Sequence, residues 1–125
     1  MNAPITNIRK DYYGKWVATT KLPLANERQL TIRTSKDLRG NLTSRASVAI
    51  VKREGGAVIE TFEVYGDYLK TVCVTAPKRV TQKTVEEQQD KALADLPYIL
   101  DNVKAFYAEK GIEVVFGGRL DLRPG

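Results

Sequence analysis

The stretch QLTIRTSKDLRGNLTSRASVAIVKR, Gln29 to Arg53, decides the fold. Apolar and polar side chains alternate on both sides of the segment Arg39-Gly40-Asn41, whose residue types accept positive φ angles. This alternation predicts a β-hairpin with one apolar side and one basic, hydroxyl-rich side. In the usual hairpin pairing Arg33 and Arg45 share the basic side, whereas a slip of one residue would separate them.

Further β-rich runs flank this hairpin. Residues 12–21 (YYGKWVATTK) precede it, and residues 57–65 (AVIETFEVY) and 68–75 (YLKTVCVT) follow it after turns that contain glycine. The spacing predicts an antiparallel meander of four to five strands over residues 15–75, with one face covered and the other in water. The side chains from the later strands that we expect in the core are Phe62, Val64, Val72 and Val74.

The pattern becomes helical over residues 82–110. Apolar side chains recur there at helical spacing: Val85, Ala92, Leu96, Ile99, Val103 and Phe106. Thr84 and Glu87 have the spacing of a capping box, and Gly111 is a C-terminal cap. Pro97 removes one backbone hydrogen bond. We therefore expect either one long helix kinked near Asp95 or two helices that meet there.

The remaining segments complete a single domain, residues 1–125. Residues 1–11 show no period and are expected to form a loose arm, and residues 117–125 a tail. Ile112 to Phe116 are a possible short final strand. The predicted fold is therefore α+β, with the antiparallel meander packed on one long, Pro97-kinked C-terminal helix.

Charge is distributed unevenly along the chain. The net charge is +5, and residues 1–53 hold eleven basic and three acidic side chains, whereas the remainder holds nine basic and twelve acidic ones. The basic half is suited to attract a polyanion, either nucleic acid or an acidic protein surface.

Several classes of protein are disfavoured by what the sequence lacks. It contains no histidine and one cysteine, Cys73, which argues against His-based catalysis and zinc sites. It also has no phosphate-binding glycine loop. We therefore expect no enzyme, no cofactor, no metal and no small-molecule substrate. Without a long apolar run or a signal-like start we expect no membrane contact and a cytoplasmic location.

Binding to nucleic acid is the function that these features favour. Arginine and lysine among threonine and serine on an open sheet are donors for phosphate oxygens. The expected contact residues are Tyr13, Lys15, Arg33, Lys36, Arg39, Arg45 and Arg53. Tyr13 is included because bases stack on exposed rings, whereas Trp16 is expected in the core or an interface.

The order of elements over residues 15–110, a basic meander followed by a long helix, resembles the layout of PC4-like and whirly-like single-stranded DNA-binding proteins. The resemblance includes no residue motif, so it implies nucleic-acid binding in general and transfers no functional residue. Single- and double-stranded DNA both remain open. We expect a homodimer that uses the apolar helix or residues 112–116. The alternative function is a small regulatory protein, such as a mobile-element accessory factor, that docks an acidic protein partner.

Overall fold

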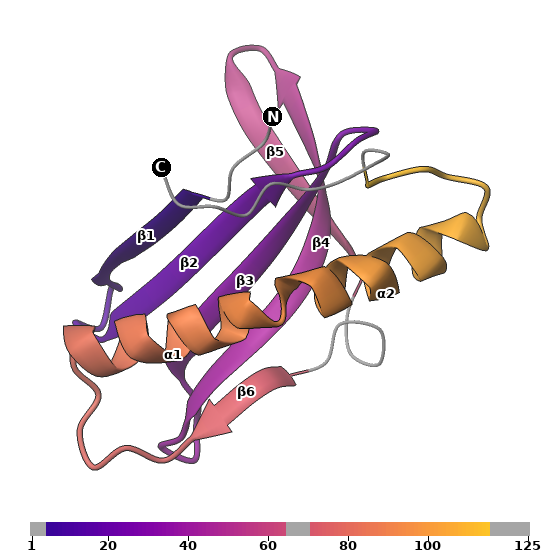
Figure 1. The fold of residues 1–125 in the computed structure, drawn as a ribbon. Helices are drawn as coiled ribbons and strands as arrows, with labels where there is room; N and C mark the ends of the chain where they lie inside the picture. The colour runs from indigo at the N-terminus through magenta and orange to yellow at the C-terminus, as the bar shows by residue number, and fades with distance from the viewer. Residues whose placement is uncertain (1–4, 65–70, 116–125) are drawn as a thin grey trace.

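The computed structural model describes residues 5–64 and 71–115, which form one antiparallel sheet with two helices on one of its faces (Figure 1). The α+β class and the meander predicted from the sequence are confirmed. The strands are β1 (Ile5–Lys10), β2 (Trp16–Pro23), β3 (Arg28–Lys36), β4 (Leu42–Glu54), β5 (Ala57–Val64) and β6 (Thr71–Thr75). The helices are α1 (Gln82–Ala94) and α2 (Leu96–Ala108).

The strands follow one another in the order β1-β2-β3-β4-β5, and β6 also pairs with β4. The second half of β4 pairs with β5, and its first half, Leu42 to Arg45, pairs with β6. Both partners run antiparallel to β4, so β5 and β6 follow the same edge one after the other. The long strand β4 is therefore the centre around which the rest of the sheet is arranged.

The turns explain why the hairpins close where they do. A two-residue loop, Gly55-Gly56, joins β4 to β5, and both glycines have positive φ angles of 58° and 83°. A two-residue hairpin of this kind needs positive φ at both positions, which glycine adopts without a steric penalty. At the β3–β4 hairpin Gly40, with φ 87°, has the same role.

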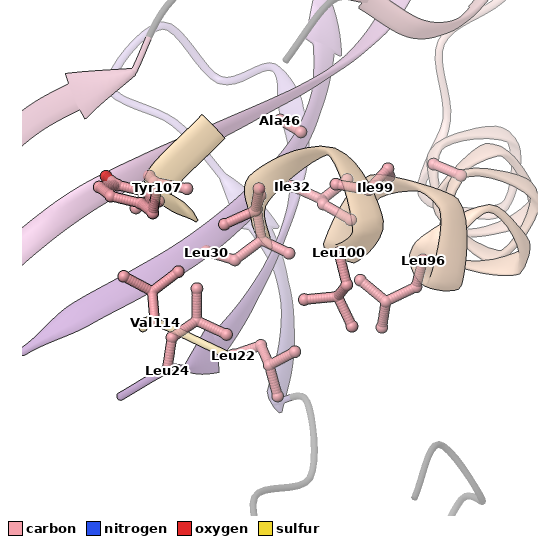
Figure 2. Packing of buried hydrophobic residues seen from close by; sticks show 13 residues of the cluster. Leu22, Leu24, Leu30, Ile32, Ala46, Leu96, Ile99, Leu100, Tyr107 and Val114 are labelled. Atoms are coloured by element: carbon pink, nitrogen blue, oxygen red, sulfur yellow. The ribbon is translucent and has the colours of Figure 1, made fainter. Parts of the chain in front are cut away.

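The core lies between the helices and one face of the sheet, which we call the helix face. Alternate side chains of β2, β3 and β4 point into it, and α2 lays its apolar stripe across them (Figure 2). The buried members include Leu22, Leu30, Ile32, Ala46, Val48, Leu96, Ile99, Leu100, Val103, Tyr107 and Val114. Complete burial of one such Leu or Ile side chain contributes about 1.5–3 kcal/mol, so this layer dominates the stability of the fold.

A smaller cluster closes the other end of the helix face. It contains Ala18, Leu42 and Val85, with the half-buried Trp16 packed against it. The Nζ atom of Lys10 lies 5.3 Å from the centre of the Trp16 ring. The expectation that Trp16 is a packing residue is therefore confirmed.

Two buried glutamines of α1 separate the two apolar clusters. The Gln89 side-chain amide donates hydrogen bonds to the Thr20 hydroxyl at 2.8 Å and to the backbone carbonyl of Ile32 at 2.9 Å, and it accepts one from the Thr34 hydroxyl. Gln89 is 1% exposed. A buried amide is tolerated only when its polar atoms find partners, and Gln89 finds three.

Gln88 makes an equivalent set of contacts with β4 and β6. Its amide donates to the carbonyl of Leu42 at 2.9 Å and to the Ser44 hydroxyl at 3.0 Å, and the Thr75 hydroxyl donates to its oxygen. The two glutamines together fix the position of α1 over β2, β3, β4 and β6. The sequence analysis did not foresee this polar layer.

Of the two alternatives for residues 82–110, the structure has two helices that meet at Asp95 and not one long kinked helix. Pro97 lies in the first turn of α2, where proline needs no hydrogen-bonded N–H. The capping box is formed by Thr81 and Thr84 and not by Thr84 and Glu87. No helix in the described part of the chain is long and apolar enough to span a membrane.

Other expectations about the edges of the sheet were wrong. Residues 5–10 are not a loose arm, because they pair with β2 as strand β1. Residues 112–115 form no strand; Val114 packs in the core and its carbonyl accepts a hydrogen bond from Ala25. Phe62 and Val74, expected in the core, are 45% and 54% exposed. The expected tail and the side chains of Val64 and Val72 lie outside the described residues.

One ion pair lies beneath the end of α2. Arg28 pairs with Glu63 at 3.2 Å, and its guanidinium carbon lies 5.4 Å from the centre of the Tyr107 ring. Burial, followed by the neighbouring Glu63 carboxylate, raises the pKa of Tyr107 to about 12. Arg28 is therefore engaged on the helix face and does not belong to the basic surface described next.

Candidate nucleic-acid interface

The other face of the sheet, which we call the open face, is hollowed, and neither α1 nor α2, the two helices of the described residues, covers it. The hollow has a volume of about 1060 Å³ and is lined by alternate residues of β1 to β5. Its polar and charged lining comprises Asn7, Arg9, Lys10, Asp11, Thr19, Lys21, Gln29, Thr31, Arg33, Arg45, Ser47 and Glu60. Five of these side chains are cationic and two are acidic, so the hollow carries a net positive charge.

Arg33 and Arg45 form the centre of this surface. The register of β3 and β4 places them directly opposite each other, as the usual hairpin pairing predicted, and Thr19 lies opposite Arg33 on the other side. Paired residues of this kind have Cα atoms about 4.5–5.5 Å apart. Both arginines are exposed, and among residues 5–64 and 71–115 neither forms an ion pair. Two like charges therefore face each other, and neither forms an ion pair with a carboxylate in the described part of the chain.

The acidic side chains of the hollow are engaged elsewhere. Glu60 accepts hydrogen bonds from Lys21 and from Gln29, each at 3.3 Å. Asp11 accepts hydrogen bonds from the backbone amides of Tyr13 and Lys15, each at 2.9 Å, within the β1–β2 turn. Both carboxylates therefore already accept hydrogen bonds from groups other than the arginine pair.

Aromatic rings lie at the two ends of the hollow. Tyr12, in the β1–β2 turn, lines one end and is 95% exposed, and Phe62 on β5 lines the other. Tyr13, expected as a stacking residue, is 80% exposed and packs edge-on against Tyr12 at 5.3 Å between ring centres. Exposed rings beside cations are suited to contact bases.

The other expected contact residues do not all join the arginine pair. Lys36 lies opposite Leu42, whose side chain is buried on the helix face, so alternation points Lys36 away from the hollow. Arg53 has the parity of Arg45 but lies eight residues along β4, about 26 Å away. The structure therefore places Lys36 on the helix face, and Arg53 on the expected face of β4 but far from the arginine pair.

Lys15 and Arg39 occupy turns at the edge of the open face. Lys15 immediately precedes β2, and Arg39 lies at the tip of the β3–β4 hairpin. Asp37 organises that tip by accepting hydrogen bonds from the amides of Arg39 and Asn41 and from the Thr43 hydroxyl, each at 2.9 Å. The Thr43 hydrogen bond is the largest cause that lowers the pKa of Asp37.

Three cations of the hollow, Arg9, Lys10 and Lys21, were not among the expected contact residues. Arg9 was assigned to a loose arm, and it reaches the open face because β1 pairs with β2. Lys21 lies on the same face of β2 as Val17 and Thr19. Extending the alternation of side chains to the end of this strand would have predicted Lys21 on the open face.

The described residues offer no metal centre. Nowhere in residues 5–64 or 71–115 do three or more His, Cys, Asp or Glu side chains gather closely enough to hold an ion. The chemistry that the open face offers is hydrogen-bond donation from guanidinium, ammonium, hydroxyl and amide groups.

Comparison of the chain with protein-family models, curated proteins and solved structures finds no match in any of the three.

Proposed function

We propose that this protein is a non-enzymatic nucleic-acid-binding protein whose open sheet face contacts the phosphate backbone. The observation that carries the proposal is the pairing of Arg33 with Arg45, side by side and without an ion-pair partner among the described residues. Like charges placed opposite each other in a sheet are destabilising. A bound phosphate removes that repulsion and accepts hydrogen bonds from both guanidinium groups.

The extent of the surface favours a polyanion over a small anion. Donor side chains continue from the arginine pair onto every strand from β1 to β4, through Asn7, Thr19, Thr31 and Ser47. Hydroxyl, amide and cationic side chains of this kind account for most phosphate contacts in protein–DNA complexes. We also propose that the protein is located in the cytoplasm.

The test is a fluorescence-anisotropy titration with labelled single- and double-stranded oligonucleotides at 50 and 200 mM salt. Arg33→Ala combined with Arg45→Ala should weaken binding. Because each lost phosphate contact reduces the slope of log K against log salt by about 0.7–0.9, the double variant should reduce that slope by roughly 1.4–1.8.

Lys91→Ala combined with Lys104→Ala is the matched control. It removes the same charge from exposed positions on α1 and α2, away from the open face, and should leave the slope nearly unchanged. Absence of binding at 50 mM salt, or an equal loss in both double variants, would refute the proposal. Capture of an acidic protein by wild type in preference to any oligonucleotide would support the alternative of a protein-docking factor.

A further inference from the structure

The outer edge of β5 is open. Within the described residues no strand pairs with the side of β5 that faces away from β4. Such an edge presents a row of unpaired N–H and C=O groups that another β-strand can bind. Three large apolar side chains on this strand are exposed, namely Val58 at 56%, Ile59 at 44% and Phe62 at 45%.

The opposite edge of the sheet, strand β1, carries cationic side chains, whereas strand β5 carries none. Strand β1 carries Arg9 and Lys10, and charged side chains on an edge strand discourage pairing with another chain. Strand β5, AVIETFEV, has no lysine, arginine or proline. It also extends with the end of β4 as a two-stranded ribbon that projects beyond the other strands (Figure 1). A ribbon of two strands is only marginally stable in water by itself.

Charge indicates what pairs with this edge. Among the six described strands β5 alone has a net negative charge, from Glu60 and Glu63, in a chain whose net charge is +5. Both carboxylates are balanced within the molecule, by Lys21 at 3.3 Å and by Arg28 at 3.2 Å. Two copies of this basic chain therefore meet with least repulsion along β5.

We infer that β5 pairs antiparallel with β5 of a second copy, about a two-fold axis normal to the sheet. A two-fold contact uses the same patch on both subunits. If the axis passes through Thr61, Glu60 lies opposite Phe62 of the partner subunit and Ile59 lies opposite Glu63 of the partner subunit. If it passed through Glu60, two glutamates would face each other, which is unfavourable. The axis therefore passes through Thr61.

This interface replaces the two dimer surfaces expected from the sequence. The apolar side of α2 is buried against the sheet, and Val114, in the segment 112–115, is buried in the core. The apolar side chains of α2 and Val114 that form the core are therefore already engaged within one chain. The inference does not depend on nucleic-acid binding, and its test contains no nucleic acid.

The test exploits the position of Thr61 on the axis, where each substitution faces its own copy. Light scattering should give the wild type twice the 14.0 kDa mass of one chain. Thr61→Lys and Thr61→Glu should each weaken the dimer by up to roughly fivefold, because a pair of like charges opposite each other costs up to about 1 kcal/mol. An equimolar mixture of the two variants should restore dimers, because lysine then faces glutamate.

Two controls make the result specific. Ile5→Lys places the same charge on the opposite edge, at an exposed position of β1, and should remain dimeric. In a Cys73→Ala background, Thr61→Cys should form an intersubunit disulfide under mild oxidation, since paired Cα atoms lie within disulfide range. Thr6→Cys on β1 should not. Circular dichroism verifies that each variant folds.

Three results would overturn the inference. The first is a wild type that remains monomeric up to about 100 μM, a concentration at which a dimer with a micromolar dissociation constant would be almost fully assembled. The second is a mixture of Thr61→Lys and Thr61→Glu that contains no more dimer than either variant alone. The third is a disulfide crosslink that forms as fast in Thr6→Cys as in Thr61→Cys. This comparison tests the inference even if a charged variant does not fold.

Discussion

At the scale of single residues, the pair Arg33 and Arg45 decreases the stability of the free protein. Each guanidinium is exposed, so water screens the repulsion, but no carboxylate of the described residues balances it. Cross-strand pairs change stability by about 0.2–1 kcal/mol, and directly opposed like charges act in the unfavourable direction. A sheet without a ligand would be more stable with threonine at one of the two positions.

Arg45→Thr is therefore expected to stabilise the free protein by roughly 0.5 kcal/mol at low salt while it weakens nucleic-acid binding. The measurement is urea unfolding at 20 and 500 mM NaCl, where screening should remove most of the gain. Arg53→Thr is the control, because Arg53 lies on the same strand and has the same parity but is far from Arg33. An Arg45→Thr protein that is less stable than Arg53→Thr at low salt would contradict this account.

At the scale of elements, α1 is held on the sheet by polar contacts as well as apolar ones. Gln89 bridges β2 and β3 through three hydrogen bonds, and replacing it leaves the buried Thr20 and Thr34 hydroxyls with fewer partners. An unsatisfied buried polar group costs about 1–3 kcal/mol, and the space left by the side chain adds to that cost.

Gln89→Ala should accordingly reduce the free energy of unfolding by roughly 2–4 kcal/mol in urea titrations. Gln82→Ala is the control on the same helix, because Gln82 is exposed, and it should change stability by less than about 0.5 kcal/mol. Equal effects of the two substitutions would mean that the amide contacts of Gln89 do not hold the helix in place.

The same elements show which features of the fold the sequence predicted and which it did not. The period of two through residues 29–53 predicted both the hairpin and the common face of Arg33 and Arg45, because a register is strongly specified where one face is buried. No comparable sequence pattern predicts that Gln88 and Gln89 are buried. Adjacent glutamines on a helix normally face water, and only the hydroxyl groups of distant strands make their burial possible.

The errors elsewhere also have physical causes. Residues 5–10 lack a clear apolar period because β1 is an edge strand, stabilised by pairing with β2. Phe62 was expected in the core together with Val64, two residues further along the same strand. A register irregularity between Val48 and Ala49, where β4 pairs with β5, sets which face it occupies, and no residue pattern marks it.

At the scale of the whole molecule, the two proposals combine into one arrangement. A two-fold axis normal to the sheet keeps both open faces on the same side of the dimer. Arg45 lies five residues from Ile50, which pairs with Thr61, so Arg45 and Arg45 of the partner subunit would be about 33 Å apart along the strands and about 14 Å across them. The resulting separation of about 36 Å is close to one turn of duplex DNA.

A dimer of this shape should bind long nucleic acids through both faces at once. For the wild type, the gain in affinity from a 10-mer to a 30-mer should exceed the gain for Thr61→Lys by up to about fivefold, because contact through both faces requires the dimer, which this substitution weakens by that factor. Anisotropy with the two lengths measures both gains, and affinity for the 10-mer should be similar in the two proteins, since Thr61 lies outside the hollow. An equal gain in the wild type and Thr61→Lys would show that the two faces act independently, even if each of them binds nucleic acid.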